Sequence, residues 1–179
     1  FIKKNINVFC EKPLTVEIKQ AENLIKLSKS VGSKLYIDDI EKYKKKNIKI
    51  NNDLNYVTRT KKDAGTAKSL LNRLAYHDFY LLSKYIELKN INSIKIIKKK
   101  KLLEFKIILK NNTIFYFHYN IASNVKKHLI NKISLDNFKN NPIKDMLRSV
   151  LYKKDDFKNN NLDALKCVKL IDRIAKIIH

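Results

Sequence analysis

The chain has 179 residues, of which 44% are hydrophobic, so it is long enough to bury one good core or a domain and part of another. Its formal net charge of +22 would ordinarily point to nucleic acid or an anionic membrane as a partner. Lysine, asparagine and isoleucine are plentiful along the whole chain and arginine is scarce, so we interpret this charge as solvated lysines and expect neither partner. No run of residues is apolar for long enough to span a bilayer.

The two cysteines, Cys10 and Cys167, stand near opposite ends of the chain, without the spacing of a metal site or a disulfide framework. We therefore predict no metal site and a reducing, cytoplasmic environment. The sequence begins with Phe1 and not with methionine, so we expect it to be a fragment of a longer protein.

Residues 1–43 are predicted to form one β-α-β unit. Residues 6–10 are a short apolar run, typical of a strand in a parallel sheet, and Pro13 ends that strand. An amphipathic helix follows as far as Gly32, a residue type that commonly ends helices, and the next strand begins at Leu35. Charged side chains thus follow the carboxyl end of the first strand, where ligands bind in open α/β sheets.

Residues 44–179 have the pattern of an α+β domain, in which helices flank a mainly antiparallel sheet. Asn111 and Asn112 are predicted to form a two-residue hairpin loop, because asparagine tolerates the positive φ of such turns. The predicted strands are 54–58, 93–98, 102–110, 113–120 and a weak one within 127–133, and the predicted helices are 69–88, 143–151 and 162–178.

Residues 9–14, Phe-Cys-Glu-Lys-Pro-Leu, with the helix after them and a strand ending in Glu-Lys-Tyr at 41–43, resemble the Gfo/Idh/MocA oxidoreductases. This is the glucose–fructose oxidoreductase and inositol dehydrogenase family, and the order of elements after residue 43 resembles it too. The resemblance implies that residues 1–43 end a Rossmann domain and that residues 44–179 form the substrate and oligomerisation domain. It covers nearly the whole chain, but the G-x-G-x-x-G fingerprint of the dinucleotide domain is absent.

In that family the Glu-Lys-Pro turn lies beside the nicotinamide, so Glu11, Lys12 and Pro13 are the residues implied to contact NAD or NADP. The resemblance also implies two catalytic residues, Lys12 and His77. The ammonium of Lys12 would stabilise a developing alkoxide, and His77 would exchange the proton of the reacting hydroxyl.

Two further residues are predicted to bind the substrate, Arg73 and Asp78. The family pattern is Asp-x-x-x-His, but here the position four before His77 is Arg73, which cannot act as a base and suits an anionic group such as a carboxylate or a diphosphate. Asp78 directly follows His77 and is expected to orient it or to cap a loop. A solvated helix residue remains the alternative for Arg73.

The remaining histidines are given structural roles: His118 is predicted to pack across strands, and His128 and His179 are predicted to be exposed. The resemblance implies an NAD(P)-dependent dehydrogenase acting on a CH–OH group of a sugar, sugar nucleotide or polyol, and a homo-oligomer formed through the sheet. With only two glycines, the chain alone is not expected to bind the cofactor well. The alternative is a non-catalytic truncated fragment or a basic interaction module.

Overall fold

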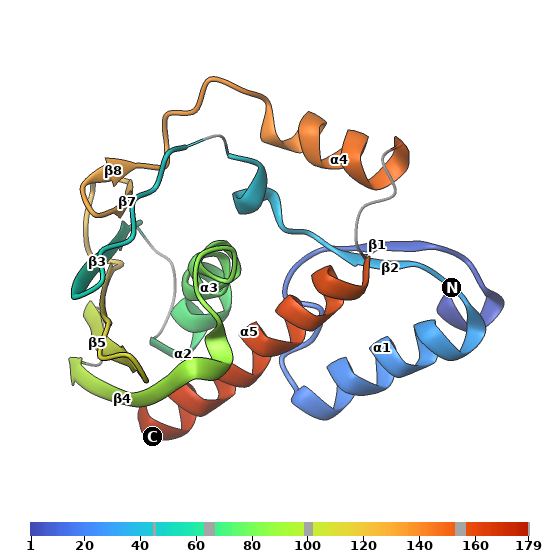
Figure 1. Ribbon diagram of the computed structural model, residues 1–179, viewed down its shortest axis with the longest axis horizontal. Coiled ribbons are helices and arrows are strands. Elements are labelled where there is room, and N and C mark those ends of the chain that lie inside the picture. Colours follow the sequence, from blue (N-terminus) through green and yellow to red (C-terminus); the bar gives the residue numbers. More distant parts are fainter. Residues whose placement is uncertain (45, 63–66, 99–101, 153–156, 179) are drawn as a thin grey trace.

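The computed structural model describes residues 1–44, 46–62, 67–98, 102–152 and 157–178. These residues form a two-stranded parallel sheet and a six-stranded mixed sheet. Figure 1 shows the two sheets on opposite sides of the molecule, with helix α5 (Phe157–Ile178) running from beside the large sheet to strand β2 of the small one. None of the helices in the described residues is long and apolar enough to cross a membrane.

The amino-terminal part is the β-α-β unit that the sequence predicts. Strands β1 (Val8–Cys10) and β2 (Leu35–Ile37) pair in parallel, and α1 (Ile18–Val31) connects them. Gly32 ends α1 with φ 72°, in the left-handed region where a residue with a Cβ is strained. A short 3₁₀ turn, η1 (Ile2–Lys4), precedes β1.

The second strand of this unit is shorter than predicted, because residues 41–43 belong to a 3₁₀ turn, η2 (Ile40–Tyr43). The side chain of Asp38 accepts a hydrogen bond from the backbone N–H of Ile40 at 2.9 Å. This local bond competes with strand pairing and turns the chain immediately after Ile37. The turn carries Glu41 away from the small sheet and into the protein interior.

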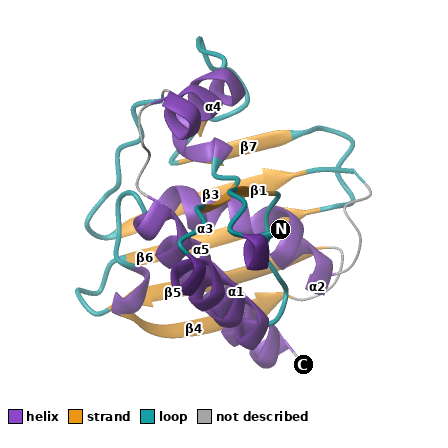
Figure 2. Cartoon of the chain, turned by 90° about the vertical axis from the view of Figure 1, so that its right-hand side faces the viewer, coloured by secondary structure: helices purple, strands orange, loops and turns teal. Residues whose placement is uncertain are grey.

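The large sheet is open and mainly antiparallel, as predicted. Its strand order is β4-β5-β6-β3-β7-β8, and β3 with β6 is the parallel pair. Figure 2 shows this sheet with α3 and α5 stacked against one face. The strands are β3 (Leu54–Thr60), β4 (Ile91–Lys98), β5 (Leu102–Leu109), β6 (Ile114–Asn120), β7 (Lys127–Ile130) and β8 (Ile133–Ser134).

The hairpin between β5 and β6 has one residue more in its loop than predicted. The N–H of Leu109 donates to the carbonyl of Thr113 at 2.9 Å, which leaves residues 110–112 as the loop. Asn112 has φ 65°, so asparagine does supply the positive φ that the turn requires. Sequence signals fix the residue type of such a turn better than its length.

A segment of three helical pieces covers the inner face of the large sheet. These are α2 (Ala67–Leu70), a π-helical turn (Leu71–Ala75) and α3 (Tyr76–Leu82). The ring of Phe79 packs edge-on against Phe105 and Phe117, which stack at 4.7 Å between centroids. These buried aromatic rings anchor the helix against strands β5 and β6.

Asn160 of α5 fastens the small sheet to the rest of the molecule. Its side chain accepts from the N–H of Ile37 and donates to the C=O of Ile37, both at 2.9 Å, and its own carbonyl accepts from Tyr80 at 2.7 Å. One hydrophobic cluster contains residues of α1, β2, the large sheet and α5. Helix α4 (Pro142–Tyr152) lies against η2. The division of the chain into 1–43 and 44–179 stays a prediction.

Candidate active site

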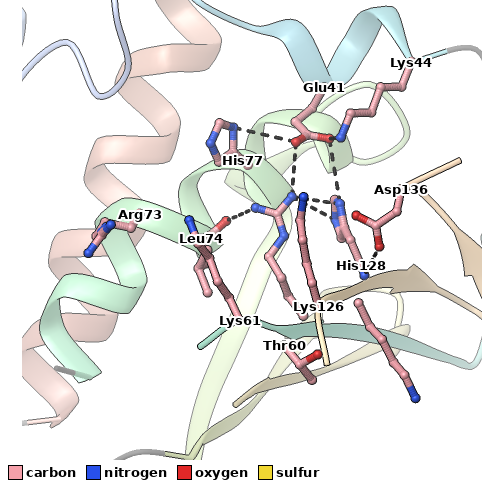
Figure 3. A pocket seen from close by; sticks show the side chains of 12 residues that line it. Glu41, Lys44, Thr60, Lys61, Arg73, Leu74, His77, Lys126, His128 and Asp136 are labelled. Carbon is pink, nitrogen blue, oxygen red and sulfur yellow. Dashed lines mark hydrogen bonds and ion pairs between the residues drawn. The ribbon is translucent and has the colours of Figure 1, made fainter. Parts of the chain in front are cut away.

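A cavity of about 180 Å³ lies where η2, β3, the π turn, α3 and β7 meet. Figure 3 shows its side chains, which come from both predicted parts of the chain. The lining is strongly cationic. It consists of Glu41, Lys44, Arg59, Thr60, Lys61, Arg73, Leu74, His77, Lys126, Lys127, His128 and Asp136.

Arg59, near the end of β3, is the buried cation of this cavity. Its Nη2 lies 3.1 Å from Oε1 of Glu41 and 3.7 Å from Oδ1 of Asp78, and its Nη1 donates to the carbonyl of Leu74 at 3.4 Å. Burial alone would raise the pKa of Glu41, but Arg59, followed by His128 and Lys44, outweighs it and lowers that pKa. The guanidinium therefore ties η2, β3 and the helix together.

Asp78 and His128 form a short hydrogen bond of 2.6 Å behind Arg59. A guanidinium only donates, so the Arg59 Nη2 that lies 2.8 Å from His128 Nδ1 makes Nδ1 an acceptor and leaves His128 Nε2–H to donate to Asp78. The hydroxyl of Tyr119 donates to the second oxygen of Asp78 at 2.8 Å. Burial opposes the ionisation of Asp78, but Arg59 and His128 hold its pKa below the usual range.

His77 lines the cavity beside this buried cluster. Burial, followed by the positive charges of Lys12 and Arg59, lowers its pKa to about 3. Its Nδ1 lies 3.9 Å from Oε1 of Glu41, which is too far for a direct hydrogen bond. His77 is thus a neutral imidazole near pH 7 and lines the cavity.

Lys12 stands on the turn after β1 and reaches the same helical segment. Its ammonium donates to the carbonyl of Arg73 at 3.1 Å and to that of Asn72 at 3.4 Å, both in the π turn. Burial, then the charge of Arg59, lowers its pKa to about 8. Lys12 is not among the residues that line the cavity, but its charge reaches His77.

The rest of the Glu-Lys-Pro turn is exposed or half-buried. The side chain of Glu11 accepts a hydrogen bond from the backbone N–H of Lys12 at 3.3 Å, and the Lys12–Pro13 peptide bond is cis. Glu11 thus stabilises the turn through the backbone of Lys12, while the ammonium of Lys12 donates to carbonyls of the π turn. The contact of these residues with a cofactor stays a prediction.

Arg73 and Asp78 differ in burial, since Arg73 is exposed and Asp78 is buried. Arg73 is exposed at the edge of the cavity and points away from His77, because the π turn shifts the alignment that residues four apart have in an α-helix (Figure 3). Asp78 is fully buried, does not line the cavity, and directs its oxygens to His128 and Tyr119. Whether either residue binds a substrate stays a prediction.

Sequence reasoning missed most of the buried cluster. The prediction that His128 is exposed is wrong: only 3% of the residue is exposed, and it lies between Arg59 and Asp78. Arg59 lies two residues after the buried Val57 on β3, and His128 lies two residues before the buried Ile130 on β7. Residues two apart in a strand share a face, so the alternation of the two strands could have placed Arg59 and His128 on the inner face from the sequence.

Two other histidine predictions have different outcomes. His118 does form a cross-strand contact, with its Nδ1 2.8 Å from Oε1 of Glu104 on the neighbouring strand. His179 lies outside the described residues. Among the described residues, no group of histidine, cysteine and carboxylate side chains has the arrangement of a metal site.

Comparisons with protein-family models and with curated proteins by sequence found no match. Solved structures do match. UDP-N-acetylglucosamine 3-dehydrogenase GnnA from Acidithiobacillus ferrooxidans is 12% identical, with a TM-score of 0.72 over 94% of this chain and 69% of that one. The neighbours are Gfo/Idh/MocA-type dehydrogenases. The chain has the fold of this family.

Two neighbours were solved with ligands. GenD2 from gentamicin A biosynthesis, in complex with NAD, is 12% identical, with a TM-score of 0.72 over 96% of this chain and 69% of that one. The WlbA dehydrogenase from Bordetella pertussis, in complex with NADH and UDP-GlcNAcA, is 13% identical, with a TM-score of 0.66 over 95% and 68%. At such identities the likeness is one of fold, and it confirms the predicted α/β and α+β architecture.

Proposed function

We propose that the chain is the carboxy-terminal part of an NAD(P)-dependent oxidoreductase that acts on a CH–OH group of a sugar, sugar nucleotide or polyol. The observation that carries this proposal is the meeting of Lys12 and His77 at one helical segment, with the pKa of Lys12 lowered to about 8 and that of His77 to about 3. Lys12 holds the π turn through the carbonyl of Arg73, and His77 follows that turn. The fold shared with known dehydrogenases supports this assignment.

In the oxidation direction, the neutral His77 imidazole takes the proton from the reacting hydroxyl as the O–H bond breaks. The ammonium of Lys12 hydrogen-bonds the same oxygen and stabilises the negative charge that develops on it. The electron pair of the C–H bond leaves with the hydrogen as hydride, which a nicotinamide cofactor would accept. In the reduction direction His77 returns the proton.

The residues present fit only one end of such a cofactor. Glu11, Lys12 and Pro13 form a turn at the carboxyl end of β1, where the nicotinamide would lie. The sequence has two glycines, Gly32 and Gly65, and so offers no glycine-rich loop for the diphosphate. We therefore place the diphosphate-binding segment outside these 179 residues and assign NAD or NADP to the longer parent protein.

The outer face of the large sheet is the surface we assign to a homo-oligomer. Tyr56 is 52% exposed there, and its ring lies 5.9 Å from that of Tyr116 on the neighbouring strand. Lys106 lies over the ring of Tyr116. Exposed aromatic side chains are enriched at protein interfaces.

The free thiols of Cys10 and Cys167 agree with a cytoplasmic location.

The test uses the protein expressed from its entire reading frame. It is assayed for reduction of NAD⁺ and NADP⁺ with inositol, hexoses, hexuronates and UDP-hexoses. With a productive substrate, His77→Ala should lower kcat by about 10² or more, the usual contribution of a positioned acid–base group. The matched control is His118→Gln, on the opposite face of the sheet, which should retain wild-type turnover.

Two results would contradict the proposal. Wild-type turnover in His77→Ala removes His77 from the mechanism. Absence of nicotinamide reduction with every substrate, together with single-stranded nucleic-acid binding that falls steeply with added salt, favours the basic interaction module that the net charge of +22 leaves as the alternative.

A further inference from the structure

The charges that line the cavity do not balance. Glu41 is paired with Lys44 at 2.8 Å and with Arg59 at 3.1 Å. The remaining carboxylate, Asp136, accepts the backbone N–H of His128 at 2.7 Å. Against it stand four exposed cations that have no carboxylate partner within the part of the chain that the structure describes. They are Lys61, Arg73, Lys126 and Lys127.

Two of these cations, Lys61 and Lys126, stand on neighbouring backbone segments that hydrogen bonds hold together. Lys61 follows β3 directly, and its N–H donates to the carbonyl of Asn120 at 3.0 Å. Lys126 follows Val125, whose carbonyl accepts the hydroxyl of Thr60. Thr60 also pairs with Lys127 in the β3–β7 ladder. A pair of like charges fixed together in this way repels itself unless an anion lies between them.

Both side chains point into the cavity. Figure 3 shows Lys61 and Lys126 directed from the strand side toward the helix that carries Leu74 and His77. Arg73 also lines the cavity, but its side chain is directed away from His77. The volume of about 180 Å³ suits one compact group and not a whole nucleotide-linked substrate. The rest of such a substrate would extend past the lysines.

We propose that Lys61 and Lys126 form a subsite for a phosphate or diphosphate group of the substrate. The proposal rests on the proposed function, in that the group it holds belongs to the molecule whose hydroxyl meets His77. Multiply charged phosphate oxygens accept several ammonium and guanidinium donors at once, which a neutral sugar hydroxyl cannot do. The substrate class narrows to phosphorylated or nucleotide-linked sugars.

The test measures the binding of inorganic pyrophosphate to the 179-residue chain by isothermal titration calorimetry. About 0.15 M salt screens the non-specific attraction between the anion and the many surface lysines. The Lys61→Ala, Lys126→Ala double variant should bind pyrophosphate about tenfold more weakly or worse, because it loses two charged donors. The matched control is the Lys19→Ala, Lys26→Ala double variant on α1, which has the same net charge and an intact cavity. It should bind as the wild type does.

A second readout separates a filled subsite from general charge attraction. Pyrophosphate between the lysines offsets the positive charge that lowers the pKa of His77, so the NMR titration midpoint of His77 should rise when pyrophosphate is added. The rise should be absent in the Lys61→Ala, Lys126→Ala variant and present in the α1 control.

Three results would overturn the subsite: equal loss of affinity in both double variants, absence of pyrophosphate binding, and selective binding of glucuronate in place of pyrophosphate. The last result would assign a carboxylate to these lysines. No cofactor or turnover enters the measurement. Pyrophosphate binding without dehydrogenase activity in the parent would therefore support the subsite and reject the oxidoreductase function. Dehydrogenase activity without pyrophosphate binding would support the oxidoreductase function and reject the subsite.

Discussion

The ammonium nitrogen of Lys12 lies 3.1 Å from the carbonyl oxygen of Arg73 and so joins the turn after β1 to the π turn before His77. A π turn interrupts the regular α-helical ladder, and such turns are frequent at functional sites. Here it presents the carbonyls of Asn72 and Arg73 to a lysine that the chain supplies from sixty residues earlier. The position of Lys12 relative to His77 thus depends on the unusual backbone of this helix.

The first prediction concerns the pH dependence of the oxidoreductase activity proposed for the parent protein. Burial and Arg59 lower the pKa of Lys12 to about 8, and the ammonium is the form that stabilises an alkoxide. We expect kcat/KM to fall as the pH rises through about 8. We expect no change between about pH 5 and pH 7, because the pKa of His77 is lowered to about 3 and its imidazole stays neutral there.

The variant Lys12→Arg checks this assignment, since a guanidinium does not lose its proton in this range. Its kcat should be lower than that of the wild type, because the larger head group fits the π turn less well, and the decline above pH 8 should disappear. A wild-type profile with a step near pH 6.5, or an unchanged alkaline decline in Lys12→Arg, would contradict the roles given to these two residues.

The second prediction concerns stability. The folded chain holds His77 neutral, whereas an unfolded histidine is protonated below about pH 6.5. The unfolded state therefore binds more protons between about pH 3 and pH 6.5, so the free energy of unfolding should fall as the pH is lowered through this window. Urea unfolding at pH 7.5 and pH 5 measures the difference. It should shrink in His77→Gln, and an equal difference in both proteins would show that His77 is not held neutral.

Much of the fold follows from the sequence. The period of two predicts the strands, the period near 3.6 predicts α1, α4 and α5, and Gly32 marks the end of α1 where the structure ends it. The lengths of the turns do not follow, as residues 40–43 and 110–112 show. A side chain such as that of Asp38 decides locally whether a strand continues, and hydrophobic periodicity carries no such information.

The site is predictable only in part. His77 and Lys12 stand out by residue type and by family resemblance, and the structure places both at one helical segment. Their electrostatic surroundings come from Arg59 and Glu41, which lie eighteen residues apart, and from His128, sixty-nine residues beyond Arg59. Pairing of β3 with β7 creates that cluster, so a reading of local patterns finds its members one by one but not their contact.

The third prediction concerns the proposed oligomer. Tyr56→Ser removes a half-exposed ring from the centre of the outer sheet face and should weaken self-association about tenfold or more, as truncation of a buried aromatic anchor does. Size-exclusion chromatography with light scattering over a concentration series measures it. The same change at Tyr152, which is exposed on α4 away from this face, is the control. A wild-type protein that stays monomeric at every concentration would reject the interface.

The fourth prediction compares two arginines of the same cavity. Arg59→Met leaves the carboxylates of Glu41 and Asp78 buried without their guanidinium, and breaking a buried ion pair in this way costs about 3–5 kcal/mol of stability. Arg73→Met makes the same chemical change at an exposed position and should cost less than about 0.5 kcal/mol. Guanidinium chloride unfolding of both variants measures the two costs.

Equal costs would mean that the buried cluster contributes no more than a surface charge. A partial rescue makes the comparison sharper. Adding Asp78→Asn to Arg59→Met removes one of the two stranded charges, while the amide oxygen can still accept from His128 and the amide NH2 can donate to the hydroxyl of Tyr119. The double variant should therefore be more stable than Arg59→Met alone. Further loss of stability in the double variant would show that Asp78 acts mainly through Tyr119 and His128, and not through the charge of Arg59.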